Sequence, residues 1–154
     1  MKTNKKILDG CCGGRMFWFN KNHPEVVYID NRKIAEQKLS NGQYFKIKPD
    51  VIMDFRKLKL KDKQFFLVVF DPPHLRLNGK SGWMAKKYGR LNKKTWKEDL
   101  RAGFKECFRV LKNNGTLVFK WNEFEVPLKE ILTLTPVKPL FGHNRGLIVQ
   151  RHTG

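Results

Sequence analysis

The turn Asp71-Pro72-Pro73-His74 directly follows the most apolar run of the chain, Phe65 to Phe70. Proline lacks a backbone N–H and has a fixed φ, so two prolines in succession predict a rigid, irregular turn after a buried strand. A turn that rigid is suited to holding side chains in position. Because carboxylates and imidazoles exchange hydrogen bonds and protons with substrates, the turn is our first candidate for a reactive site.

A second candidate is the turn Asp9-Gly10-Cys11-Cys12-Gly13-Gly14, which follows the first apolar run. Glycines at this place let a cofactor approach the backbone. The turn lacks a complete GxGxxG pattern, so a tight strand-to-helix connection with nothing bound explains it equally well. Asp30, 21 positions after Asp9, ends the second apolar run, where an acidic side chain can accept both hydroxyl hydrogens of a ribose.

Four carboxylates, Asp9, Asp30, Asp54 and Asp71, each end or follow a successive apolar run. The carboxyl ends of parallel strands meet at one edge of an open α/β sheet, and that edge is where ligands bind. Any single one of these residues could instead cap a helix. All four together predict a ligand site at this edge.

The elements that would position these residues are short apolar runs separated by turns. Because the runs are apolar on both faces, they suit parallel strands covered by helices on either side. The expected strands are Lys6 to Leu8, Val26 to Ile29, Val51 to Met53, Phe65 to Phe70 and Thr116 to Trp121. We therefore predict an α/β, Rossmann-like three-layer sandwich with a mostly parallel sheet. Residues 137–141 and 147–150 should form a C-terminal antiparallel hairpin at one edge.

The clearest helix prediction runs from Thr95 to about Lys112, with Thr95 and Glu98 spaced as a capping box and Gly115 just beyond its end. Weaker patterns predict shorter helices at 15–21, 32–39, 55–60 and 126–132. No repeat or linker interrupts the chain, so residues 1–154 are expected to form a single domain.

Composition indicates a folded body with a polyanionic partner. The 154 residues carry a formal net charge of +18, and 40% of them are hydrophobic, too many for a disordered basic tail. The longest apolar run is far too short to span a bilayer, and no signal-peptide core is present, so we expect a cytoplasmic protein. Three cysteines without CxxC spacing and four scattered histidines predict neither disulfides nor a metal site.

Taken with its motifs, nearly the whole chain resembles the class I S-adenosylmethionine-dependent methyltransferases. The turn at Asp71 looks like the Asp/Asn-Pro-Pro-aromatic motif of those that methylate exocyclic amino groups of nucleic-acid bases. Residues 7–9 look like the family's cofactor loop, 28–30 its second motif, and 109–115 its corner between a helix and the fifth strand.

The resemblance implies S-adenosyl-L-methionine as the cofactor. Its amino-acid end would lie at Asp9 and the backbone of Gly10, Cys11, Cys12 and Gly13, its ribose at Asp30, and its adenine at Asp54 and Phe55. Asp71 and the carbonyl of Pro72 would accept hydrogen bonds from the target amine. No metal is implied.

Two positions depart from the family pattern. Arg15 stands where a second loop glycine is frequent, and its guanidinium could pair with the cofactor carboxylate. His74 stands where an aromatic hydrocarbon ring commonly stacks on the target base. An imidazole can stack as well, or transfer a proton, and the sequence does not decide between these roles.

Half of the net charge lies next to the proposed catalytic turn, since residues 74–112 carry +9. The stretch at about 74–94, a predicted substrate loop, has no acidic residue. Its basic residues are Arg76, Lys80, Lys86, Lys87, Arg90, Lys93 and Lys94. Such side chains would bind phosphates and give salt-dependent affinity, with DNA and RNA equally suited.

These observations predict a methyltransferase acting on a nucleic-acid base, with adenine N6 ahead of cytosine N4. Two alternatives remain. One is a methyltransferase of proteins or small molecules, and the other is a nucleic-acid-binding module with a vestigial cofactor site. A chain of this length leaves no room for a separate recognition domain, so a homodimer or a specificity partner could supply one.

Overall fold

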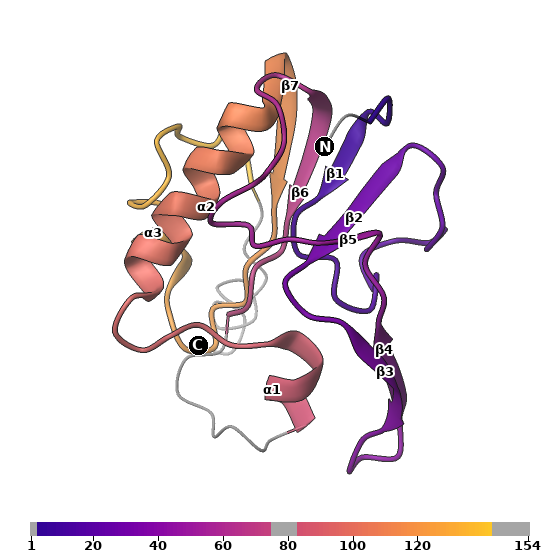
Figure 1. Cartoon of the computed structure of the whole chain (residues 1–154). Helices are drawn as coiled ribbons and strands as arrows, with labels where there is room; N and C mark the ends of the chain where they lie inside the picture. Colours follow the sequence, from indigo (N-terminus) through magenta and orange to yellow (C-terminus); the bar gives the residue numbers. More distant parts are fainter. Residues whose placement is uncertain (1–2, 75–82, 143–154) are drawn as a thin grey trace.

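A five-stranded parallel sheet forms the centre of the computed structural model, which describes residues 3–74 and 83–142 (Figure 1). The strand order is β5-β2-β1-β6-β7, and each neighbouring pair is parallel. The strands are β1 (Ile7–Asp9), β2 (Val26–Asp30), β5 (Val51–Ile52), β6 (Phe65–Phe70) and β7 (Leu111–Phe119). With β1 in the middle and the order reversing beside it, this is the arrangement of a Rossmann-like sheet. The predicted α/β, Rossmann-like class is confirmed.

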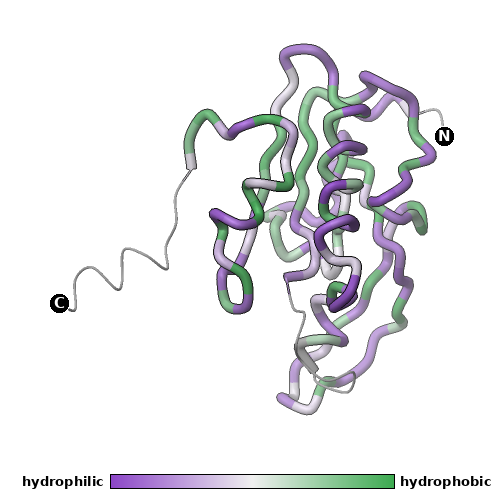
Figure 2. Tube along the Cα trace, turned by 90° about the vertical axis from the view of Figure 1, so that its left-hand side faces the viewer, coloured by the Kyte–Doolittle hydropathy of each residue, from purple (hydrophilic) through white to green (hydrophobic). Residues whose placement is uncertain are grey.

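The hydrophobic core lies between this sheet and α2 (Trp96–Val110). Phe70 of β6 packs edge-on against Phe104 of α2, with ring centroids 5.3 Å apart. The predicted helix at 95–112 is confirmed, although its start differs in detail. The Thr95 hydroxyl donates to the Asp99 carboxylate at 2.9 Å, and no side chain caps the first backbone N–H groups. Figure 2 shows the hydrophobic stretches of the strands behind α2.

Helix α2 lies on one side of the sheet, whereas α1 (Trp83–Tyr88) lies beyond the carboxyl ends of the strands (Figure 1). Part of the other face is covered by the irregular segment after β1, in which the ring of Trp18 lies edge-on to Tyr28 of β2 at 5.7 Å. Residues 15–21 and 55–60 form turns, so the helices predicted there are wrong. Residues 126–132 contain only the single turn α3 (Leu128–Ile131).

The helix predicted at 32–39 is also wrong, because these residues begin an antiparallel hairpin of β3 (Ile34–Lys38) and β4 (Tyr44–Ile47). Side chains of β4 alternate between exposed and buried, as in a strand with one face on a core. Gly42, with φ of 84°, forms the turn after Asn41, and Asn-Gly is a strong hairpin signal.

Residues 137–141 are not a strand in the structure. The second half of the predicted C-terminal hairpin, 147–150, lies outside the described residues.

Candidate functional site

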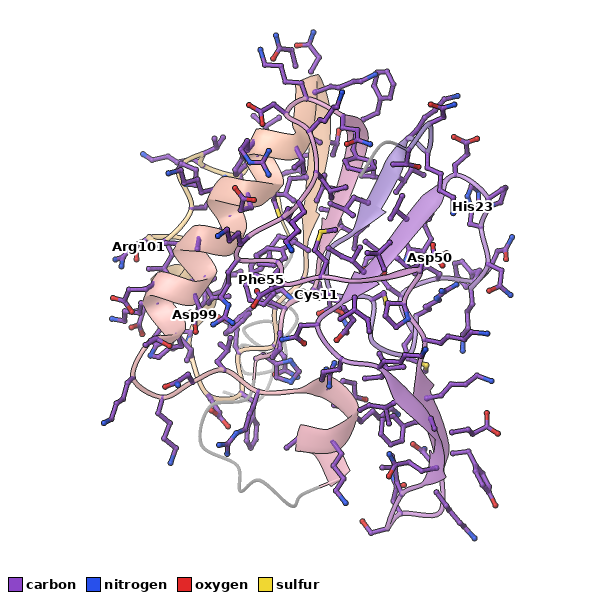
Figure 3. All side chains as sticks on the ribbon, in the orientation of Figure 1. Cys11, His23, Asp50, Phe55, Asp99 and Arg101 are labelled. Carbon is purple, nitrogen blue, oxygen red and sulfur yellow. The ribbon has the colours of Figure 1, made fainter. Side chains whose placement is uncertain are left out.

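A cavity of about 890 Å³ lies where β1, β2 and β6 end, at the carboxyl edge of the sheet. The two candidate turns, Asp9 to Gly14 and Asp71 to His74, both line it. Figure 3 labels three of the lining positions, Cys11 in the first of these turns, Phe55 after β5 and Asp99 in the first turn of α2. The α1 helix (Trp83–Tyr88) and the β3–β4 hairpin complete the wall. The predicted convergence of strand-end residues at this edge is therefore seen for Asp9, Asp30 and Asp71.

The glycine-rich turn is fastened to both neighbouring strands. Gly10 donates its backbone N–H to the carbonyl of Val69 at 2.9 Å, and Cys12 donates to that of Ile29 at 2.8 Å. Gly13 has φ of 47°, in the left-handed region that favours glycine. These bonds hold the turn open toward the cavity.

Asp9 is buried beneath this turn, with 2% of its surface exposed. Its carboxylate accepts the indole N–H of Trp18 at 2.7 Å and the backbone N–H of Cys11 at 3.2 Å. Burial raises the pKa of Asp9 from 3.8 to about 6, although both hydrogen bonds favour the charged form, and Asp71 and Asp30 add smaller repulsive contributions. The charged form of Asp9 is therefore costly to the fold at this buried position.

This cost predicts a pH-dependent stability. Because the folded-state pKa lies above the unfolded one, the contribution of Asp9 is most favourable below about pH 4 and is lost as the pH rises through about 6. A shift of this size corresponds to about 3 kcal/mol. Urea unfolding at pH 4 and pH 7 measures the free energy of unfolding of wild type and of Asp9→Asn. Between pH 4 and pH 7, the variant should gain about 3 kcal/mol of stability relative to wild type. An unchanged difference would contradict the raised pKa.

Asp30, at the end of β2, is buried and lines the cavity, but its oxygens are already engaged. Oδ1 accepts the backbone N–H and Nε of Arg32, at 2.9 and 3.0 Å. Oδ2 accepts the backbone N–H of Gly13 at 3.0 Å and Nη2 of Arg32 at 3.2 Å. Arg32 also donates to the carbonyl of Lys86 in α1 at 3.3 Å. A ligand hydroxyl must therefore compete with Arg32 for Asp30.

The same Asp-x-Arg arrangement recurs after β5, where the guanidinium of Arg56 binds both oxygens of Asp54. The guanidinium of Arg56 also donates to Asp99 at 3.1 Å. Arg56 lines the cavity, whereas Asp54 does not. Asp54 is thus paired with Arg56 and is not part of the cavity wall in this structure, and its contact with a ligand adenine stays a prediction.

Phe55, between these two residues, does line the cavity. Its ring packs edge-on against Phe70 at 5.4 Å. Both rings press against Gly103 of α2, where a Cβ atom would lie 2.7 Å from each. A glycine in the helix thus makes room for the flat ring beside the cavity.

The second turn is held by β7. Lys120, just after that strand, donates its backbone N–H to the carbonyl of Phe70 and its ammonium to Oδ2 of Asp71, at 3.1 and 2.9 Å. Pro72 is buried. The ring of His74 lies 6.1 Å from that of Tyr88 and 6.4 Å from that of Trp121.

Burial lowers the pKa of His74 below its usual value, and the opposing attraction of Asp71 is smaller. The imidazole is therefore mainly neutral at neutral pH, so that it can both stack and accept a hydrogen bond.

Arg15 does not line the cavity in this structure, and its pairing with a ligand carboxylate stays a prediction that would require it to leave its present partners. Its Nη2 binds the Asp50 carboxylate at 3.0 Å and the Lys48 carbonyl at 2.8 Å, and its guanidinium stacks over the Tyr28 ring at 3.8 Å. With φ of 56°, its backbone adopts the left-handed conformation, which glycine adopts more freely than other residues.

The two cysteines of the first turn line the cavity as protonated thiols. Burial raises the pKa of Cys11 well above its usual value and that of Cys12 to about 12. Since the thiolate is the nucleophile, neither side chain is suited to covalent catalysis at neutral pH.

Among the described residues, only some of the basic side chains predicted to bind nucleic acid line the cavity. Lys87 and Arg90 line the cavity, and Lys87 donates to the side-chain oxygen of Gln43 in the hairpin at 3.2 Å. Lys86, Lys93 and Lys94 are exposed and do not line it. Arg76 and Lys80 lie outside the described residues.

Sequence reasoning missed Lys120 and the hairpin residues of the cavity wall. Lys120 follows the end of β7 at Phe119, but the strand expected from the sequence continued to Trp121, so the rule that found the aspartates did not point to it.

No group of three or more His, Cys, Asp or Glu residues suited to a metal ion occurs within residues 3–74 and 83–142. Over the same residues, no helix has the length and apolar character needed to cross a membrane.

No protein-family model and no curated protein matches the chain. Among solved structures, it is similar to the crystal structure of the PH0226 protein from Pyrococcus horikoshii OT3, with a TM-score of 0.47 and 20% sequence identity. The match covers 98% of this chain and 55% of that chain, so this chain spans about half the length of that protein.

Proposed function

We propose that the protein is an S-adenosylmethionine-dependent methyltransferase that acts on an exocyclic amino nitrogen of a nucleic-acid base, with adenine N6 favoured. The observation that carries the proposal is that the glycine-rich turn and the Asp-Pro-Pro-His turn open into one cavity. The cavity lies at the carboxyl edge of a Rossmann-like sheet, which is where such sheets bind ligands. Its volume of about 890 Å³ lies within the range of small-molecule and cofactor sites.

The residues present suit the cofactor chemically. Asp9 offers a buried carboxylate for an ammonium group, Asp30 offers one for ribose hydroxyls, and Phe55 offers an aromatic face for a purine. The fit requires Arg32 to give up part of its pairing with Asp30. When bound, the cofactor supplies a methyl group on a positively charged sulfur.

In the proposed reaction, Asp71 and the carbonyl of Pro72 accept hydrogen bonds from the target amine and orient its lone pair toward the methyl group. The nitrogen–carbon bond forms as the carbon–sulfur bond breaks, and positive charge grows on the nitrogen. The Asp71 carboxylate stabilises that charge and is an acceptor for the departing proton. Lys120 holds Asp71 in place through the 2.9 Å ion pair.

A nucleic-acid-binding module without methyl transfer is the second candidate, because of the contacts of Arg32 and Asp54. Arg32 covers the acceptors of Asp30, and Asp54 lies outside the cavity wall. A protein that no longer binds the cofactor could keep the Arg32–Asp30 pair and the position of Asp54 outside the cavity wall without loss of function.

Isothermal calorimetry with S-adenosylmethionine distinguishes the methyltransferase from the binding module. Wild type should bind with measurable heat, and Asp30→Ala should weaken binding by about tenfold or more through loss of a buried charged acceptor. Asp54→Ala is the matched control, since Asp54 also follows a strand and pairs with an arginine but does not line the cavity. Absence of heat with wild type, or equal binding by Asp30→Ala, would refute the cofactor assignment.

Arg32→Ala is expected to strengthen S-adenosylmethionine binding by about three- to tenfold. The substitution frees the carboxylate oxygens of Asp30, so the ligand no longer has to displace the Arg32 guanidinium from them. Arg32→Lys keeps the charge but cannot form the bidentate pair with Asp30. Its affinity for S-adenosylmethionine should therefore lie between that of wild type and that of Arg32→Ala. The same titration measures both variants. Weaker binding by Arg32→Ala would mean that Arg32 itself holds the ligand.

A further inference from the structure

Three exposed aromatic rings line the cavity, each from a different element. Phe17 belongs to the segment after β1, Tyr44 to β4 and Tyr88 to the end of α1. Their exposed fractions are 43%, 69% and 39%, respectively. The proposed methyl transfer uses none of these rings.

Each ring is accompanied by a lysine ammonium. The Nζ atom of Lys120 lies 5.9 Å from the centroid of Phe17, that of Lys38 lies 5.9 Å from Tyr44, and that of Lys87 lies 5.3 Å from Tyr88. We call these the three aromatic–lysine pairs. Because Lys120 also holds Asp71 at 2.9 Å, Lys38 and Lys87 are the cations that the pairs offer to phosphates. A flat face for a base next to a cation for a phosphate is the arrangement that binds a strand of unpaired nucleotides.

The hairpin and α1, which carry two of the pairs, meet beside the cavity. Lys87 of α1 donates to Gln43, next to Tyr44, at 3.2 Å. Arg90 adds further positive charge to the wall, whereas Lys46 is paired with Glu36 at 3.1 Å and adds no net charge. The hairpin is anchored by a small core of its own, in which Leu39, Phe45 and Ile47 are buried, so Tyr44 sits on a supported element.

We propose that the three aromatic–lysine pairs bind a single-stranded segment of nucleic acid across the mouth of the cavity. The inference rests on the proposed function and narrows its substrate to unpaired nucleotides. Bases in a duplex are stacked on one another and have no face available to these rings, whereas unpaired bases can stack on them. The net charge of +18 provides the complementary attraction to phosphates.

Fluorescence anisotropy with labelled oligonucleotides tests the proposal on the full chain without cofactor. A single-stranded 16-mer, as DNA and as RNA, should bind at least about tenfold more tightly than the duplex of the same sequence. The RNA and DNA arms identify which backbone the protein prefers. Duplex binding equal to or tighter than single-strand binding would overturn the proposal.

Single substitutions test the rings themselves. Tyr44→Ala and Phe17→Ala should each weaken single-strand binding by about five- to a hundredfold, and Tyr44→Phe should retain it, because a stacked base needs only the flat ring. The control is Phe66→Ala. Phe66 is 53% exposed and has Lys112 Nζ 3.9 Å from its ring, but it lies at the start of β6 and does not line the cavity.

Near-wild-type binding by both cavity variants, or an equal loss in Phe66→Ala, would overturn the proposal. Lys38→Gln should lower the slope of log affinity against log salt by about one, as expected for one lost phosphate contact. An unchanged slope would remove Lys38 from the site.

The binding assay needs no methyl transfer, so the two proposals fail separately. Ring-dependent binding of single strands without turnover would uphold the binding surface and refute the enzyme. Methylation of duplex DNA that is unaffected by Tyr44→Ala and Phe17→Ala would uphold the enzyme and refute the binding surface.

Discussion

Replacing Asp71 with alanine should lower the rate of methyl transfer by about 10²- to 10³-fold, the usual cost of losing one preorganised group that stabilises developing charge. Affinity for S-adenosylmethionine should stay within about threefold of wild type, because Asp71 acts on the amine rather than on the cofactor. Asp71→Asn keeps one oxygen acceptor and should retain more activity than Asp71→Ala. Transfer of a radiolabelled methyl group to single-stranded oligonucleotides, followed by nucleoside analysis, measures both variants.

Lys120→Met removes the ion pair but keeps the Asp71 carboxylate, so it separates the direct effect of the carboxylate from the effect of the pair. Lys120 is exposed and holds Asp71 from one side, so its loss should reduce the rate far less than the loss of the carboxylate. Full turnover by Asp71→Ala would refute the role assigned to this residue. An equal loss in Asp71→Ala and Lys120→Met would instead assign the effect to the ion pair.

Arg109→Ala should reduce the free energy of unfolding by about 3 kcal/mol, since charge-assisted bonds at a half-buried site are lost together. The guanidinium donates to the backbone carbonyls of Leu58 and Leu60 at 2.8 and 2.9 Å, and its Nε donates to Glu106 at 2.8 Å. It thereby fixes the segment between β5 and β6 against α2. In a chain of this size the melting temperature should fall by about 6–12 °C, as measured by circular dichroism.

Arg101→Ala is the matched control on the same helix. Arg101 is exposed and its one ion pair, to Glu98, is 3.8 Å long, so its loss should change stability by less than about 0.5 kcal/mol. Arg109→Lys should recover little of the loss, because lysine cannot reach several carbonyls and carboxylates in the fork geometry of a guanidinium. Equal stability of Arg109→Ala and Arg101→Ala would contradict this assignment.

The sheet could be predicted, because its strands are visible as short apolar runs in the sequence. The convergence of Asp9, Asp30 and Asp71 could also be predicted, because the carboxyl ends of parallel strands meet at one edge. The hairpin at 34–47 was missed, because Ala35, Glu36 and Gln37 favour a helix and only the pairing with β4 overrides that preference. The Asn41-Gly42 turn was the one local signal that could have indicated it.

The positions of Arg15 and Asp54 relative to the cavity also could not be predicted. Spacing fixes where a side chain leaves the backbone, whereas the direction of its carboxylate or guanidinium depends on partners such as Asp50 and Arg56. Strand ends are thus a better guide to the location of the site than to the ligand contacts within it.

The strand order has a consequence for how the chain acquires its structure. β1 pairs with β2 on one side and with β6 on the other, and residues 65–70 are synthesised long after residues 7–9. Such distant pairings slow folding, because a long loop must close before the contacts that reward it can form. The β3–β4 hairpin pairs residues close in the sequence and can form early. During synthesis, one edge of the central strand therefore stays unpaired until β6 has emerged, and an unpaired strand edge can pair with other chains.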